Sequence, residues 1–96
     1  MEKRNPRYRL EDFKASDFSI TTIARKNAFE LGLTMDDVHD AVSSMKPGQF
    51  YKSMTSYADH TKWQDVYHVP YGDWLLYIKF TEDAVTEFRL LSFKEK

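Results

Sequence analysis

FYKSMTSYADHTKWQDVY, which spans Phe50 to Tyr67, is the most informative stretch of this chain. It places lysine, aspartate, histidine, glutamine and tyrosine side chains among a few apolar residues, a denser set of polar groups than core packing requires. Cations hold phosphates, amides read the edges of bases, and aromatic rings stack on unpaired bases. The stretch therefore makes a single-stranded nucleic acid a candidate ligand, although composition alone does not establish one.

The first part of this stretch fits two local structures. Residues 50–57 could form a helix with Phe50, Met54 and Tyr57 on one side, or an extended segment with Phe50, Lys52 and Met54 on one face. The threonine, tyrosine and phenylalanine content favours the extended form.

The remainder of the chain is predicted to be rich in β-strands. Alternating apolar residues indicate strands over residues 63–69, 73–81 and 85–93, separated by turns of hairpin length. In the second of these strands one face is apolar and belongs to the core. Tyr77 and Lys79 fall on the other face, so we expect them to point outward together.

The first half of the chain is predicted to be helical. Residues 9–16 suit a short helix at the edge of a core, and residues 18–21 a brief extended segment. Thr22 is the candidate N-cap of a helix over residues 23–31, which Gly32 ends.

A third helix has the clearest start signal. Thr34 and Asp37 have the three-residue spacing of a capping box. Apolar residues then repeat on one helical face, at Val38, Ala41, Val42 and Met45.

Helices that come first and strands that follow predict an α+β fold. We expect a mainly antiparallel sheet with the N-terminal helices packed on one face. With 96 residues, residues 1–96 are expected to form a single domain, because the chain is too short for a second core.

Composition narrows the class of protein. The chain has no cysteine, which removes disulfides, thiolate metal sites and a cysteine nucleophile. No apolar run approaches the roughly 20 residues that span a bilayer, so we expect a cytoplasmic protein without a membrane partner. The net charge of −1 argues against nonspecific coating of nucleic acid, which depends on many cations. Any RNA contact must be local.

The polar residues favour metal-free acid–base chemistry. There is no glycine-rich phosphate loop, and the three histidines are neither helix-spaced nor backed by cysteine. Cleaving RNA without a metal needs a base near the 2′-hydroxyl, an acid near the leaving 5′-oxygen and cations around the phosphorane. The candidate cations are Lys52, Lys79 and Lys94, and the candidates for proton transfer are His60 and Tyr77.

Four motifs also carry a family resemblance. Two lie in the central stretch, at residues 50–55 (FYKSMT) and 63–67 (WQDVY), and two lie at the ends, at residues 1–4 (MEKR) and 92–96 (SFKEK). Together they resemble the MqsR toxin family along the whole chain.

This resemblance implies a type II toxin with a RelE-like fold. It implies a ribosome-independent endoribonuclease that cuts mRNA with a preference for GCU-like sites. It also implies a cognate antitoxin with a zinc-binding domain and a helix-turn-helix domain. The zinc would belong to the antitoxin, and DNA would be contacted only indirectly, through that partner.

Taken position by position, the resemblance implies functional roles for Lys52, Gln64, Tyr77 and Lys94, all of which are present. We expect Tyr77 to transfer a proton or orient the phosphate, and the two lysines to stabilise the phosphorane. Gln64 is expected to position the phosphate or a base. His60 is a further candidate for acid–base chemistry.

Other interpretations stay open at this point. The same surface could hold RNA or a protein partner without cutting, or the chain could be a degenerate toxin that keeps only its antitoxin contact. The lysines could be solvated, Tyr77 could be sheet packing, and His60 could be a turn residue beside a capping aspartate. The hairpin at residues 68–73 departs from the family pattern and is given no family role.

Overall fold

The structure is a computed structural model that describes residues 2–56 and 58–93. The described elements, in chain order, are β1 (Glu2–Lys3), α1 (Leu10–Ala15), β2 (Ser19–Ile20), α2 (Thr22–Glu30), α3 (Met35–Ser43), a 3₁₀ turn at Pro47–Gln49, β3 (Phe50–Thr55), β4 (Trp63–Tyr71), β5 (Trp74–Thr81) and β6 (Ala84–Phe93). None of the helices within these ranges is long and apolar enough to cross a membrane.

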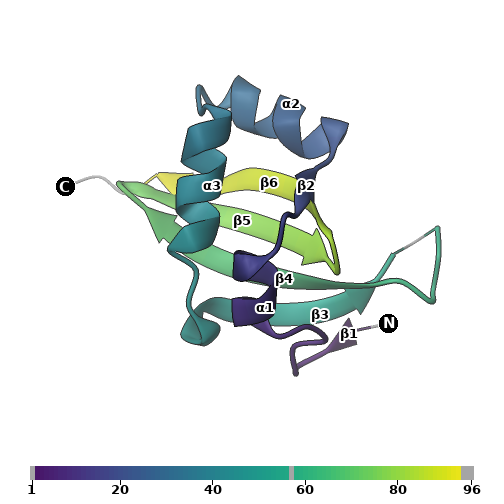
Figure 1. The fold of residues 1–96 in the computed structure, drawn as a ribbon. Helices are drawn as coiled ribbons and strands as arrows, with labels where there is room; N and C mark the ends of the chain where they lie inside the picture. The colour runs from purple at the N-terminus through teal and green to yellow at the C-terminus, as the bar shows by residue number, and fades with distance from the viewer. Residues whose placement is uncertain (1, 57, 94–96) are drawn as a thin grey trace.

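The strands form one sheet in the order β1-β3-β4-β5-β6-β2. Every pairing is antiparallel except that of β2 with β6, which is parallel. Figure 1 shows α1 and α3 crossing one face of the sheet, with α2 lying along β6. The predicted α+β class, the antiparallel sheet and the one-sided helices are confirmed, whereas the RelE-like description stays a prediction.

Local sequence signals explain where the helices begin and end. Gly32 has a φ of +79°, and the N–H of Leu33 reaches back to the carbonyl of Ala28, so a left-handed glycine ends α2 as expected. The Thr34–Asp37 capping box forms in full at the start of α3. The predicted cap of α2 was wrong by one position, because Thr21, not Thr22, accepts the N–H of Ala24.

The core lies between the helices and one face of the sheet. Its buried members come from all three helices and from β4, β5 and β6, among them Phe13, Ala28, Val42, Tyr67, Val69, Leu76, Ile78, Phe80 and Phe88. The strand residues in this set alternate along each strand, as a half-buried sheet requires. None of the helices in the described residues covers the other face of the sheet (Figure 1).

The strand pairings shift register at three places. One, between the pairs Leu75–Ser92 and Leu76–Leu90, lies near the end of β6, and the other two shape the helix-free face. Between β3 and β4 the pairing passes from Phe50–Tyr67 to Lys52–Val66, so Tyr51 is an extra residue. Between β5 and β6 it passes from Lys79–Glu87 to Phe80–Val85, so Thr86 is extra. At such β-bulges consecutive side chains can emerge on one face. The expectation that Phe50 and Lys52 share a face is therefore wrong, since Phe50 packs against the core.

Asp65 anchors the N-terminal segment to the sheet. Its side chain is fully buried on the helix-bearing face and accepts backbone N–H groups from Arg7 at 3.0 Å and Tyr8 at 2.9 Å. The Tyr8 hydroxyl adds a hydrogen bond to the Trp63 carbonyl. These contacts fix the segment between β1 and α1, and β1 pairs with the outer edge of β3.

We expect Asp65→Ala to lower the free energy of unfolding by about 1–3 kcal/mol, because it removes the acceptor of two backbone N–H groups. Urea denaturation measures the change. Asp65→Asn keeps one acceptor oxygen and should lose less, and the exposed Asp17→Asn serves as the control. Equal stability of Asp65→Ala and the parent would contradict the anchoring role.

Candidate active site

Three of the predicted site residues lie on the helix-free face of the sheet. Lys52 is on β3, Gln64 on β4 and Tyr77 on β5, and the strand registers turn all three side chains away from the core. Gln64 is four residues from His68 along β4, about 13 Å at an ordinary strand rise, so it marks one end of this face.

A row of rings crosses the middle of the face. Tyr51 stacks on His68 with ring centroids 4.3 Å apart, and the His68 and Tyr77 rings are 6.2 Å apart. The Arg89 guanidinium lies 4.4 Å from the centre of the Tyr77 ring. We call these four residues the cross-strand row. Because neighbours cover it, Tyr77 is only 8% exposed even though it points away from the core.

Lys52 lies beside this row and is held by an ion pair. Its Nζ is 2.7 Å from the Glu2 carboxylate, supplied by β1. The hydrogen bond from Lys52 to Glu2 raises the pKa of the lysine, and the same bond lowers the pKa of Glu2. Lys52 is therefore a fixed cation, but one whose charge is partly matched by a carboxylate.

A shallow hollow of about 330 Å³ opens next to Lys52. It is lined by side chains from β1 and β3 and the residue after β1, namely Glu2, Lys3, Arg4, Tyr51 and Lys52. Cations and an aromatic ring are the groups that single-stranded nucleic acids contact in proteins. The short strand β1, which the sequence did not reveal, thus builds one side of the site.

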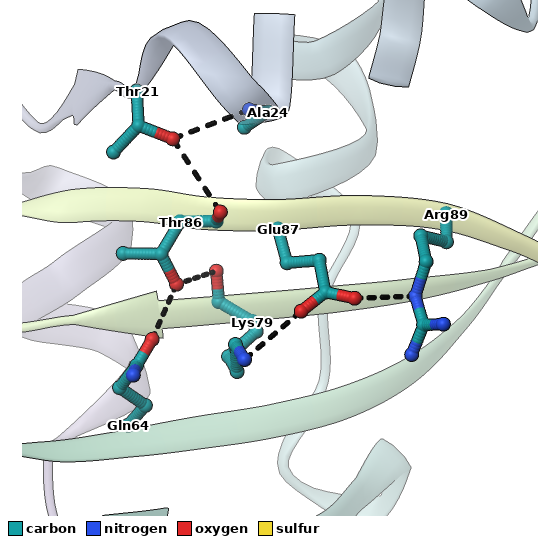
Figure 2. Close-up of polar contacts among 7 residues, drawn as sticks. All are labelled: Thr21, Ala24, Gln64, Lys79, Thr86, Glu87 and Arg89. Carbon is teal, nitrogen blue, oxygen red and sulfur yellow. Dashed lines mark hydrogen bonds and ion pairs between the residues drawn. The ribbon is translucent and has the colours of Figure 1, made fainter. Parts of the chain in front are cut away.

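The side chain of Gln64 is oriented by a hydrogen bond from β6. Its side-chain oxygen accepts a hydrogen bond from the Thr86 hydroxyl, and the Thr86 carbonyl accepts one from Thr21, the N-cap of α2. Figure 2 shows this chain of contacts. The oxygen of the Gln64 amide is engaged by the bond from Thr86, so its NH₂ group is the part of the amide that remains to donate a hydrogen bond.

A second ion-pair group joins β5 and β6 and consists of Lys79, Glu87 and Arg89. The Glu87 carboxylate binds Lys79 at 2.9 Å and also Arg89, as Figure 2 shows. Lys79 was a candidate phosphate cation, but here its ammonium is partly buried and paired. Glu87 also helps to hold Arg89 over the Tyr77 ring. This acidic residue therefore positions two cations of the face, Lys79 and Arg89.

Two further predicted residues are not in this arrangement. His60 is exposed in the β3–β4 loop, beyond the last strand pair at Thr55–Trp63, and the loop projects from the sheet (Figure 1). The neighbouring Asp59 accepts the Thr61 N–H, as the turn interpretation expected. Lys94 lies outside the described residues, so its role stays a prediction.

Sequence reasoning missed three members of the site. His68 fell in the hairpin that was given no role, Arg89 was not considered, and Glu2 was seen only as part of the motif at residues 1–4. The one available signal was alternation, which puts His68 on the same strand face as Gln64. Nothing local indicated that β1 would bring Glu2 to Lys52.

The comparisons with known proteins agree with this architecture. A family model for a toxin, described as "Motility quorum-sensing regulator, toxin of MqsA", matches residues 5–95. The chain therefore belongs to the MqsR toxin family. A relative from Escherichia coli (strain K12), named mRNA interferase toxin MqsR, is 41% identical over 100 residues, and the alignment covers 100% of both chains.

Burial lowers the pKa of His68 below its ordinary value of about 6.5. The unfolded chain therefore binds a proton at His68 more tightly than the folded chain. The contribution of His68 to folding stability is complete above the unfolded pKa, and it is lost as the pH falls through the folded pKa.

We expect His68→Phe to remove this part of the pH dependence. Urea denaturation at pH 7.5, 6.0 and 5.0 compares the variant with the parent, and the parent should lose more stability between the first and last pH. An identical pH dependence of both proteins would contradict the burial effect.

Proposed function

We propose that this chain is an endoribonuclease toxin of the mRNA interferase type, cutting mRNA independently of the ribosome and without a metal, with a preference for GCU-like sites. The observation that carries this proposal is the placement of Lys52 and Tyr77 on the same helix-free face, on the strands that flank His68 of β4. The name of the 41% identical relative, an mRNA interferase toxin, supports it.

Each residue has a chemical role in this proposal. Lys52 is a cation that stabilises the charge developing on the phosphorane, which is the largest single contribution of many active sites. Tyr77 carries a phenol that can donate a proton. Gln64, whose amide oxygen is engaged by Thr86, holds the phosphate or a base edge through its NH₂ group. Lys94 is proposed as a second phosphate cation, and His60 as a secondary acid–base candidate.

The site has to exchange ion pairs when RNA binds. Glu2 occupies Lys52 in the free protein, so a phosphate must displace this carboxylate or share the lysine with it. Arg4 and Lys3 border the same hollow and supply further positive charge there. This local group of cations reconciles RNA binding with a net charge of −1.

The proposed setting is a toxin–antitoxin pair in the cytoplasm. The family description names the toxin as that of MqsA, and we propose that the cognate antitoxin of this chain binds zinc and contacts DNA through a helix-turn-helix. The toxin would then reach DNA only through its antitoxin. We also propose that residues 1–96 act as one toxin domain.

A cleavage assay with purified protein tests the activity. We expect a defined RNA with several GCN triplets to be cut in excess EDTA at GCU-like sites, leaving a cyclic phosphate or its opened form. Tyr77→Phe should reduce the rate by roughly 100- to 10,000-fold, because it removes one proton-transfer group, while circular dichroism shows that it is folded.

Two results would contradict the proposal. If the parent binds the RNA in a gel shift but leaves it intact, the chain is a binding module. If Tyr77→Phe cuts as fast as the parent, Tyr77 has no part in proton transfer.

The Glu2–Lys52 ion pair gives a second prediction. Glu2→Gln should bind RNA more tightly, because Lys52 no longer has a competing carboxylate. A cut-site RNA with a 2′-deoxy sugar allows the dissociation constant to be measured without cleavage. If one more phosphate contact forms, the slope of log affinity against log salt should steepen by about 0.7.

Glu30→Gln is the matched control, since it changes the charge equally on the exposed side of α2. Equal RNA affinity of Glu2→Gln and Glu30→Gln would show that Glu2 does not compete with RNA for Lys52.

A further inference from the structure

His68 lies at the centre of the helix-free face. The Tyr51 ring from β3 stacks on its imidazole at an interplanar angle of 25°. On the other side, Tyr77 of β5 is its direct partner in the strand register. His68 is thus the histidine that the described structure places against the proposed catalytic tyrosine, whereas His60 lies in the projecting loop.

The charged groups that share the helix-free face with His68 come from the other strands of the sheet. The cations are Lys52 on β3, Lys79 on β5 and Arg89 on β6, and the carboxylates are Glu2 on β1 and Glu87 on β6. Each carboxylate is engaged by at least one of these cations, and no ion pair joins His68 to a described carboxylate. The imidazole is therefore held by ring contacts in a slightly cationic setting, with its nitrogens available.

We propose that His68 is the general base of RNA cleavage and that Tyr77 is its general acid, an assignment that rests on the proposed function above. The two side chains project from adjacent strands on the same face, with ring centroids 6.2 Å apart. They can therefore address opposite sides of one phosphodiester group, with the Lys52 cation beside it.

The proton and electron balance of the step is complete without another reactant. A nitrogen lone pair of His68 takes the proton of the 2′-hydroxyl while the 2′-oxygen bonds to phosphorus. The bond from phosphorus to the 5′-oxygen breaks, and that oxygen takes the phenolic proton of Tyr77. The products are a 2′,3′-cyclic phosphate and a 5′-hydroxyl. One proton then passes from the imidazolium to the phenolate, directly or through water, which restores both groups.

The environment of His68 suits a base. Burial lowers its pKa, so the imidazole is neutral at physiological pH and can accept a proton. Stacking on Tyr51 fixes the plane of the ring, which limits the orientations in which the nitrogens meet the substrate. A ring held for packing alone would share this stack but would not control the pH dependence of the reaction.

The first test compares single-turnover cleavage at pH 5 to 9 for the parent and His68→Phe, which keeps a flat ring against Tyr51. We expect a rate loss of roughly 100- to 10,000-fold and loss of the acid limb that the parent shows at low pH. Affinity for the 2′-deoxy RNA should change less than about threefold. His68→Gln repeats the test should the phenylalanine variant not fold, and His39→Phe, on α3, is the histidine control.

A sulfur substitution separates the two roles. An RNA with a 5′-bridging sulfur at the mapped cut site has a leaving group that needs no protonation. Tyr77→Phe should recover most of the parent rate on this RNA, whereas His68→Phe should stay slow, because the 2′-hydroxyl still needs a base.

The outcomes are distinct. If the parent cuts RNA and His68→Phe retains its rate and acid limb, the assignment of His68 is wrong while the proposed function stands. Recovery of His68→Phe by the sulfur substrate would make His68 the acid and overturn the assignment as well. If the parent cuts no RNA at all, the proposed function and this inference both fall.

Discussion

Two β-bulges determine which side chains reach the helix-free face. The extra residue at Tyr51 allows both Tyr51 and Lys52 to emerge there, and the extra residue at Thr86 does the same for Thr86 and Glu87. In a regular strand, neighbouring side chains point to opposite faces. Without the bulge at Tyr51, either Tyr51 or Lys52 would point into the core, and the face would lack the stacked ring or the cation. Without the bulge at Thr86, either Thr86 or Glu87 would point into the core.

Contacts between distant parts of the chain hold this face in place. The buried side chain of Asp65 accepts hydrogen bonds from the backbone N–H groups of Arg7 and Tyr8. This anchor helps to place β1 on the edge of β3 and the Glu2 carboxylate beside Lys52. On the other side, the Thr21 cap of α2 binds the backbone of Thr86. The helix layer and the helix-free face are therefore connected through this hydrogen bond.

Charge in the site is arranged by pairing. Glu2 and Glu87 neutralise part of the charge of Lys52, Lys79 and Arg89, so these long side chains are fixed before a substrate arrives. Preorganised charges stabilise a transition state better than mobile ones, because they need no rearrangement during the reaction. The cations outnumber the carboxylates in this set, so the face is slightly cationic although the chain has a net charge of −1.

The sequence by itself determined the α+β class, the end of α2 at Gly32 and the start of α3 at Thr34. It also determined the strand alternation that turns Tyr77 outward and the motifs of the family. These features depend on local backbone chemistry and on residue identity. Only the tertiary structure decided the bulges, the strand β1, and the approach of Glu2 to Lys52 and of His68 to Tyr77. Register and contacts between residues distant in sequence arise from packing of the whole sheet, and no local pattern encodes them.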